Sequence, residues 1–309
     1  MKKSLSLFLV FVICFCLMDR FVFYAFNSIE KQVLSGSAGK VNRFFKLKDS
    51  ISLITLGSSR ALHHVISSEL NPSSFNMGVD GTRIAYASAM ISTLKKKNQL
   101  ILVHVDHNRI FDQNYKGKDA EGLLYKKFEI PELAAFFNKY YRQEVYTAMV
   151  SKCYAYNGML LGVVKNYLSP TEISTNLNGY EPIYPTDTQQ QIFAEMLVNT
   201  PEQWNVNISK PLQISKTFND FIDAIIKKAN STNSTVVFIT SPSLNKVDNE
   251  VKNEAALYFT SKAVMYWDDI DLFEEFNASL WKDYTHLSHA GAKEYTAHLQ
   301  TRMANIPLN

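Results

Sequence analysis

Residues 52–60 read Ser-Leu-Ile-Thr-Leu-Gly-Ser-Ser-Arg, an apolar stretch that stops at a glycine and two serines. Apolar residues then recur at helical spacing over 60–70, and Pro72 follows. The pattern predicts a buried strand over 52–56 and a helix that begins directly after it. A polar turn in this position lies at the carboxyl edge of a parallel sheet, where open α/β folds bind ligands. Ser59 is therefore the first candidate functional residue.

The same alternation continues along the chain. After a short extended piece at 75–77, the sequence predicts strands and helices in turn. The expected strands are 100–105, 235–240 and 264–267, and the expected helices are roughly 85–97, 218–229 and 290–303. Strands that alternate with helices indicate an α/β fold with a parallel sheet covered on both faces.

Composition excludes several classes of protein. The 309 residues carry a net charge of +3 without a long Lys/Arg block, so we expect no nucleic-acid partner. Cys14 and Cys16 lie in an apolar run and only Cys153 lies elsewhere, which does not indicate a disulfide framework. The run from His104 to His107 resembles part of a metal-ligand motif, but Leu102 stands where an upstream histidine ligand is needed, so we expect no metal site. No phosphate-binding glycine loop is present, and we expect no cofactor.

The N-terminus predicts a membrane anchor. Lys2-Lys3 precede an apolar run over 4–18 that resumes over 21–26 after Asp19-Arg20. As a helix, residues 4–26 would reach about 34 Å, enough for a hydrocarbon core of about 30 Å. No small-residue cleavage site follows closely, so an uncleaved anchor over 1–27 is favoured over a cleaved signal peptide. We expect a single-pass protein of the inner (cytoplasmic) membrane, with its body in the periplasm or exterior.

Beyond the anchor, the sequence predicts a stem over 28–50 and one domain over 51–309. Within that domain, residues from about 110 to 211 lose the alternation and become rich in Tyr and Phe, which indicates a helical insertion. These aromatic residues would form either a lid or sugar-stacking surface, or the packing face of the inserted helices. The second interpretation is favoured.

Near the C-terminus, Asp283 and His286 are spaced so that a carboxylate can hold one imidazole nitrogen while the other faces a nucleophile. Leu287 would anchor the loop in the core, and Ser288 would cap the last helix. His289 and His298 are the competing histidines. At the other end of the domain, the backbone N–H groups of the helix after Ser59 are suited to stabilising an oxyanion. The alternative role for Ser58 and Ser59 is helix capping alone.

Four segments together resemble the SGNH/GDSL hydrolase family: residues 57–60, 76–81, 106–108 and 283–286. The resemblance implies a three-layer α/β/α fold with a flavodoxin-like parallel sheet. It identifies Ser59 as the nucleophile, His286 as the base and Asp283 as its partner. It also implies an oxyanion hole made of Arg60 N–H, Gly81 N–H and Asn108.

The match to the family has departures and open alternatives. Ser58 replaces the usual Asp, Arg60 the usual Leu, Asp106-His107 the usual glycines, and Arg109 the usual Asp. Gly78 competes with Gly81, and Asn76 can instead shape the turn. For Asn108, capping of a turn after the strand remains the alternative.

The expected activity is a serine esterase or deacylase that acts on acylated glycans of a bacterial envelope. One alternative is an O-acyltransferase for a cell-surface polysaccharide, served by a membrane partner that delivers the acyl donor. Another is a non-catalytic protein of this fold that binds glycans or assists assembly. The Arg60 side chain would bind an anionic group of the glycan or, as the favoured interpretation, a structural carboxylate.

Overall fold

The computed structural model describes residues 2–171, 178–199, 208, 210–273 and 277–306. These residues belong to two compact units, each made of two chain segments. Unit 1 contains residues 1–46 and 120–173, and unit 2 contains residues 47–119 and 174–309. The predicted stem and the predicted insertion at 110–211 are thus each divided between the units. Within the predicted insertion, residues 172–177, 200–207 and 209 lie outside the described residues.

Unit 2 is built on a five-stranded, all-parallel sheet with the order β2-β1-β3-β4-β5. This confirms the predicted α/β class and parallel sheet. The strands are β1 Leu53–Leu56, β2 Ser74–Asn76, β3 Leu100–His104, β4 Thr235–Thr240 and β5 Met265–Asp268. All residues of β1, β2 and β3 are buried, as expected of strands covered on both faces.

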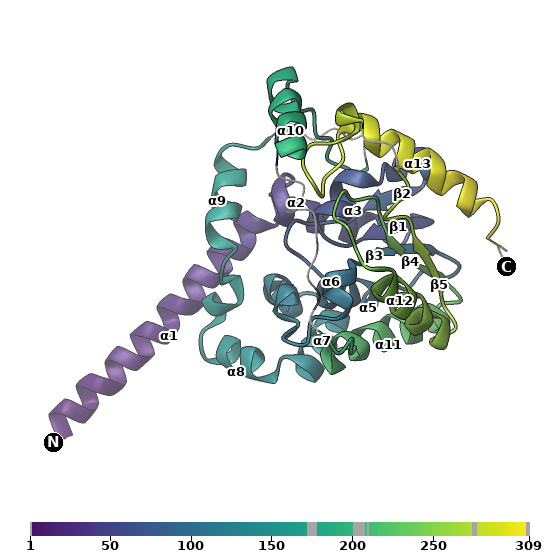
Figure 1. The fold of residues 1–309 in the computed structure, drawn as a ribbon. Helices are drawn as coiled ribbons and strands as arrows, with labels where there is room; N and C mark the ends of the chain where they lie inside the picture. The colour runs from purple at the N-terminus through teal and green to yellow at the C-terminus, as the bar shows by residue number, and fades with distance from the viewer. Residues whose placement is uncertain (1, 172–177, 200–207, 209, 274–276, 307–309) are drawn as a thin grey trace. The chain divides into compact units, whose positions relative to one another are not determined.

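Helices lie on both sides of this sheet (Figure 1). On one side, α13 (His289–Met303) packs with α3 (Ser59–His64) and α4 (Ser67–Leu70). On the other side lie α5 (Ile84–Ser92), α11 (Lys216–Ser231) and α12 (Asn249–Ser261). There Phe259 of α12 stacks on both Phe238 and Tyr266. The remaining described helices of unit 2 are α6 (His107–Ile110), α10 (Asp187–Asn199) and η5 (Ala278–Leu280).

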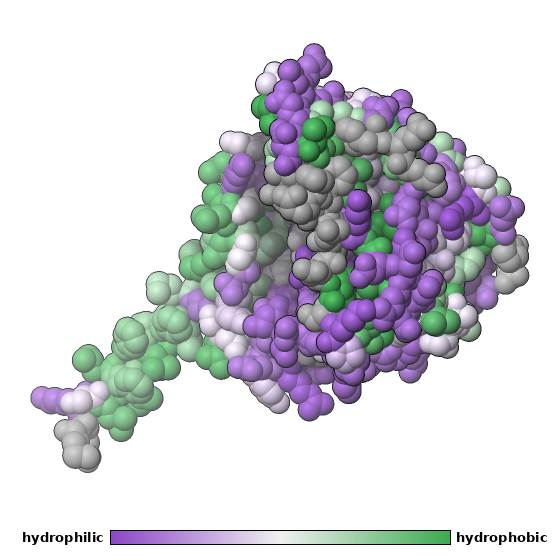
Figure 2. Space-filling model, viewed as in Figure 1, coloured by the Kyte–Doolittle hydropathy of each residue, from purple (hydrophilic) through white to green (hydrophobic). Residues whose placement is uncertain are grey.

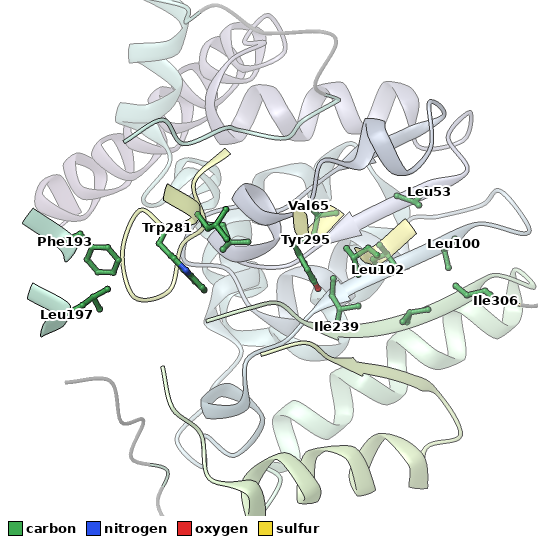
Figure 3. Packing of buried hydrophobic residues seen from close by; sticks show 14 residues of the cluster. Leu53, Val65, Leu100, Leu102, Phe193, Leu197, Ile239, Trp281, Tyr295 and Ile306 are labelled. Atoms are coloured by element: carbon green, nitrogen blue, oxygen red, sulfur yellow. The ribbon is translucent and has the colours of Figure 1, made fainter. Parts of the chain in front are cut away.

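The core on the α13 side joins the sheet to the C-terminal helix (Figure 3). Leu102 and Ile239 of the sheet belong to one buried cluster with Tyr295 of α13, and all three are completely or almost completely excluded from solvent. Trp281 and Leu287 extend this cluster under the loop that carries His286. The loop is therefore anchored in the core at both of its ends.

The predicted helix over 60–70 is wrong in its middle, because the structure breaks it into α3 and α4. The Asn76 amide donates to the carbonyl oxygens of Ala61 and Val65, both at 2.8 Å. Ile66 N–H is likewise diverted to the Thr296 hydroxyl at 3.1 Å. The Asn76 and Thr296 side chains thus bond backbone groups that, in a continuous helix, would bond other backbone groups of the same helix.

The predicted helix over 85–97 is also too long, since α5 ends at Ser92. Lys96, which lies inside the predicted helix, instead donates to the carbonyl oxygens of Ser50 and Ile51 at 3.1 and 2.8 Å. Lys96 therefore binds the backbone just before β1, and the residues after Ser92 do not continue α5.

Unit 1 is helical in its described residues. Its helices are α1 (Lys2–Glu30), α2 (Gly36–Leu47), α7 (Pro131–Tyr140), α8 (Arg142–Val150), η2 (Lys152–Tyr156) and α9 (Leu160–Leu168), while η1 (Lys118–Phe128) begins at the boundary with unit 2. Aromatic residues pack with one another inside it: Tyr125 stacks on Tyr156, and Phe137 contacts Tyr141. For these residues the favoured interpretation, packing through an aromatic face, agrees with the structure.

Helix α1 is long and apolar enough to cross a membrane, a property that signal sequences share. Figure 2 shows apolar side chains along most of its length. Its C-terminal part is different, because Asp19, Phe23 and Glu30 are buried within unit 1. Glu30 forms a buried ion pair with Lys126 at 2.8 Å. One face of residues 19–30 therefore packs into unit 1, while Phe21 and Tyr24 in the same stretch stay exposed.

Candidate active site

The predicted site residues meet at the carboxyl edge of the sheet in unit 2. A cavity of about 280 Å³ opens there. Its lining includes Ser59, Arg60, Gly81, Asn108 and His286, which come from four separate parts of the sequence. Strands β1 and β3 deliver the first and third blocks because their carboxyl ends are neighbours in a parallel sheet.

Ser59 is the first residue of α3 and directly faces His286. Its hydroxyl donates to His286 Nε2 at 2.8 Å. Ser58 occupies the N-cap of α3, yet its side chain makes no capping hydrogen bond. Capping alone thus does not account for this serine pair, and Ser59 has the partner that a nucleophile requires.

Asp283 holds the other side of the imidazole. His286 Nδ1–H donates to the Asp283 carboxylate, with both oxygens at 3.0 Å. Thr285 also donates to Asp283, through its N–H at 2.8 Å and its hydroxyl at 3.0 Å. Burial alone would raise the pKa of Asp283, but the hydrogen bonds from His286 and Thr285 outweigh it and hold that pKa well below its usual range. Asp283 is consequently an anion that fixes the His286 tautomer.

The loop that presents His286 is held by its backbone and by its neighbours. Lys282 N–H donates to His286 O at 2.8 Å, which closes the turn between Trp281 and Leu287. Leu287 is fully buried, and the Ser288 hydroxyl accepts the Gly291 N–H at the start of α13. The sequence-based roles of Leu287 as an anchor and Ser288 as a cap both agree with this geometry.

A second histidine array lies next to the first and is buried, with only His104 reaching the cavity lining. Leu287 N–H donates to His64 Nε2 at 3.0 Å, so His64 Nδ1–H donates to the Ser241 hydroxyl at 2.8 Å. Ser241 in turn donates to His104 Nε2 at 3.0 Å. Burial holds the pKa of His64 well below its usual value and lowers the pKa of His104 to about 3. We call His64, Ser241 and His104 the buried network.

Arg60 attaches the nucleophile helix to this buried network. Its guanidinium forms an ion pair with Asp106 and donates to the carbonyl oxygens of Ser241 and Pro242. Burial would raise the pKa of Asp106, but the Arg60 charge keeps it below its usual value. The structure therefore assigns the Arg60 side chain to a structural carboxylate, the interpretation favoured from sequence.

The expected oxyanion donors lie around the same cavity. Gly81 has φ +73°, a left-handed conformation that favours glycine, and the space beside its Cα is open. Asn108 is exposed on α6 and, within the described residues, its amide has no hydrogen-bond partner. Gly78 is unsuited to this role, because its N–H already donates to Asn76 Oδ1 at 2.8 Å. Asn76 shapes this turn, as the alternative interpretation expected.

Other residues of the site were missed from sequence. Thr285 braces Asp283 from within the 283–286 segment, and His64 was not among the predicted site residues. Arg60 and Asp106 each follow a strand, and strands that run side by side bring such residues together. That adjacency was the available signal. Ser241 carried no signal, since only the three-dimensional contacts reveal its role.

The competing residues have other partners. His289 contacts the Tyr180 hydroxyl at 3.0 Å, and His298 pairs with Asp269 at 3.2 Å. His107, from the candidate metal motif, pairs with Asp268 at 2.7 Å. Among the described residues, no group of three or more His, Cys, Asp or Glu side chains is placed to hold a metal ion.

Comparison with known proteins adds no identification. No protein-family model matches this chain, and a search of curated proteins gives no match. The site is therefore interpreted from its own geometry.

Proposed function

We propose that this protein is a serine esterase or deacylase that acts on acylated glycans of a bacterial envelope. The observation that carries the proposal is the continuous hydrogen-bonded array from Asp283 through His286 to Ser59, which ends at an open cavity. A nucleophile, a base and a residue that orients the base are the minimum set for acyl transfer to serine.

In the proposed reaction, Ser59 Oγ attacks the ester carbonyl while His286 Nε2 accepts the hydroxyl proton. The tetrahedral oxyanion is stabilised by Arg60 N–H, Gly81 N–H and the Asn108 amide. His286 then donates its proton to the leaving alcohol oxygen as the carbon–oxygen bond of the ester breaks. A water molecule, deprotonated by His286, attacks the acyl-serine. The bond between the acyl carbon and Ser59 Oγ then breaks while His286 returns the proton to Oγ, which releases the carboxylic acid and regenerates the serine. Asp283 stays ionised throughout and stabilises the imidazolium.

We also propose that the sheet and its helices form an SGNH-like fold. A sheet of order β2-β1-β3-β4-β5 has the strand order of flavodoxin-like, doubly wound folds. Helices on both sides of that sheet and the placement of all four sequence blocks at one cavity support an SGNH-like fold. The departures at Arg60 and Asp106 are linked, because these two residues form an ion pair with each other.

The cavity lining supports a glycan ester as the substrate class. Asn245 and Arg109 offer polar groups for hydroxyl or carboxylate recognition, while Tyr115 and Phe218 form an almost fully buried, apolar part of the lining. A volume of about 280 Å³ suits part of a larger ligand.

We also propose that α1 is an uncleaved, single-pass anchor in the inner membrane, with Lys2 and Lys3 on the cytoplasmic side. Cleavage after the apolar run would remove or sever residues that unit 1 buries, notably Asp19 and Phe23. This packing supports an anchor over a signal peptide, and in the proposed orientation both units lie in the periplasm or exterior.

The test is hydrolysis of p-nitrophenyl acetate by the full chain in detergent, beside Ser59→Ala and His286→Gln. The full chain is required because α1 contributes to the core of unit 1. Matched controls are Ser261→Ala, at the exposed end of α12, and His289→Gln, outside the cavity lining. We expect turnover in the wild type and both controls, and its loss in both site variants.

Acylated oligosaccharides added as competitors identify the preferred substrate class. Mass spectrometry of the sugars then separates hydrolysis from transfer, since only an O-acyltransferase leaves new acyl groups on an acceptor glycan. A folded wild type without turnover, alone or with an acyl-donor partner, would contradict the enzymatic proposal and favour a glycan-binding role.

A further inference from the structure

Asp19 and Arg20, the charged residues inside the apolar helix α1, are hydrogen-bonded to the segment of unit 1 that joins α8 to η2. The Asp19 carboxylate accepts hydrogen bonds from the Ser151 hydroxyl at 2.6 Å, Lys152 N–H at 2.8 Å and Cys153 N–H at 3.2 Å. These three residues, with Met149 and Val150, form the junction between α8 and η2. We call residues 146–153 the α8–η2 corner.

Arg20 completes the same arrangement on the other side of the corner. Its guanidinium donates to Met149 O at 2.9 Å and Val150 O at 3.3 Å, and it forms an ion pair with Asp19. Backbone groups at the end of α8 and the start of η2 are thus paired with α1 side chains instead of water. Irregular backbone is tolerated at membrane depth only when its polar groups are satisfied in this way.

The position of Asp19 along α1 sets the depth of this corner. If the span begins at Lys3, Asp19 lies about 24 Å along the helix, whereas the hydrocarbon core is about 30 Å thick. Residues 19 and 20 then lie inside the far boundary of the core, and they lie further inside it if Lys3 is in the headgroup region. The α8–η2 corner is bonded to these residues and therefore lies at the same depth.

The outer surface of the corner is apolar. Tyr146, Met149 and Val150 are 67%, 60% and 73% exposed. On α1, the neighbouring Leu17, Met18 and Phe21 are exposed as well, and the apolar surface along α1 is continuous in Figure 2. Lys152 donates to the Tyr24 hydroxyl at 3.0 Å, a tyrosine and lysine pair suited to the headgroup region.

From these observations we propose that the α8–η2 corner is inserted into the outer leaflet of the bilayer, so that Met149 and Val150 contact lipid beside α1. This inference rests on the proposed membrane span. It also gives the Asp19-Arg20 pair a function, since these charges satisfy the backbone of a segment that enters the membrane with the helix.

The experiment measures depth at single labelled positions in the full chain. Cys14 and Cys16 are replaced by Ala and Cys153 by Ser, which keeps a hydroxyl donor toward Asp19 O. A nitrobenzoxadiazole fluorophore is then attached at Val150→Cys, at Leu17→Cys within the span, or at Leu257→Cys, an exposed leucine of α12 in unit 2. Each protein is reconstituted in phosphatidylcholine and phosphatidylglycerol vesicles with or without brominated acyl chains.

We expect the label at position 150 to be quenched by brominated lipid several-fold more than the label at 257, and to be shielded from aqueous iodide. Quenching at 17 without quenching at 150 would overturn the proposal and leave the membrane span intact. Absence of quenching at 17 would overturn both the span and this inference. Shielding of position 150 from iodide without lipid quenching would show that protein, not lipid, covers the corner, and would also overturn it.

Discussion

Two histidine arrays lie side by side in unit 2, and they are built in opposite ways. His64 and His286 have ring centroids 6.3 Å apart and nearly perpendicular planes. His64 is fully buried and, among the described residues, has no carboxylate partner; it bonds Leu287 N–H on one side of the ring and the Ser241 hydroxyl on the other. His286 is partly exposed, is bound to Asp283 and ends on a hydroxyl that faces a cavity.

The difference separates a structural histidine from a candidate base. A buried imidazole without a counter-charge stays neutral, because the cost of burying its cation is not offset. An imidazole beside an ionised carboxylate, with access to a ligand, is arranged to accept a proton during a reaction. The enclosed array then serves to position the open one, since His64 binds the N–H of Leu287, directly after His286.

The largest expected effect tests the open array. Asp283→Asn should lower esterase kcat by about 10⁴-fold, because the amide no longer stabilises the imidazolium or its tautomer. The side chain is 42% exposed, so the melting temperature should change little. Steady-state kinetics beside thermal unfolding measures both quantities. Unchanged kcat in this variant would remove Asp283 from the proposed mechanism.

The ion pair that supports the nucleophile helix should give the next largest effect. Asp106→Asn leaves the Arg60 charge buried without its carboxylate and should lower the free energy of unfolding by about 3 kcal/mol. The double variant Arg60→Met with Asp106→Leu should recover much of that loss. Urea denaturation of the three proteins provides the comparison. Equal destabilisation of the single and double variants would speak against an uncompensated charge as the cause.

Breaking the buried network should have a smaller but clear effect. His64→Leu leaves Leu287 N–H and the Ser241 hydroxyl without their partner and should cost about 2 kcal/mol of unfolding free energy. Esterase activity should fall as well, because the loop that carries His286 loses a tether. The adjacent His63→Leu, outside this network, is the matched control. Equal losses in both variants would show that the network has no special role.

Acid should weaken the buried network before it affects the carboxylates. Burial lowers the folded-state pKa of His64 and His104, so the unfolded chain binds more protons below a pH of about 6.5. Their contribution to stability is complete above that pH and is lost as the pH falls toward the folded-state values. At pH 5 the loss should be about 2 kcal/mol per histidine. Unfolding of wild type and His64→Leu at pH 7 and pH 5 checks this, since the variant should lose less.

Much of the fold was predictable because it depends on local patterns. β4 was predicted with its observed bounds, and the other strands within one or two residues, since apolar strands in a covered parallel sheet have a clear signature. The break between α3 and α4 was not predictable, because Asn76 takes carbonyl groups that the helix would use. Nothing in residues 60–70 themselves encodes that competition.

The candidate site shows the same division. Ser59, Asp283 and His286 were found through spacing, and the structure brings them within hydrogen-bond distance. The buried network escaped prediction, because its three members come from α3, β3 and the loop after β4. Unit 1 was hidden for a related reason, as it joins chain segments on either side of residues 47–119.

The packing of α1 into unit 1 also has a consequence for biogenesis. Residues 19–30 leave the ribosome early, yet their partners Lys126, Ser151 and Tyr156 follow only after the first three strands of the sheet. In the proposed topology, the helix must therefore remain at the membrane, with its buried face unpartnered, until residues 120–173 have been exported. If a protease removed this helix before then, unit 1 would lose buried residues and could not assemble. In that topology, α1 must therefore stay attached until export and folding are complete.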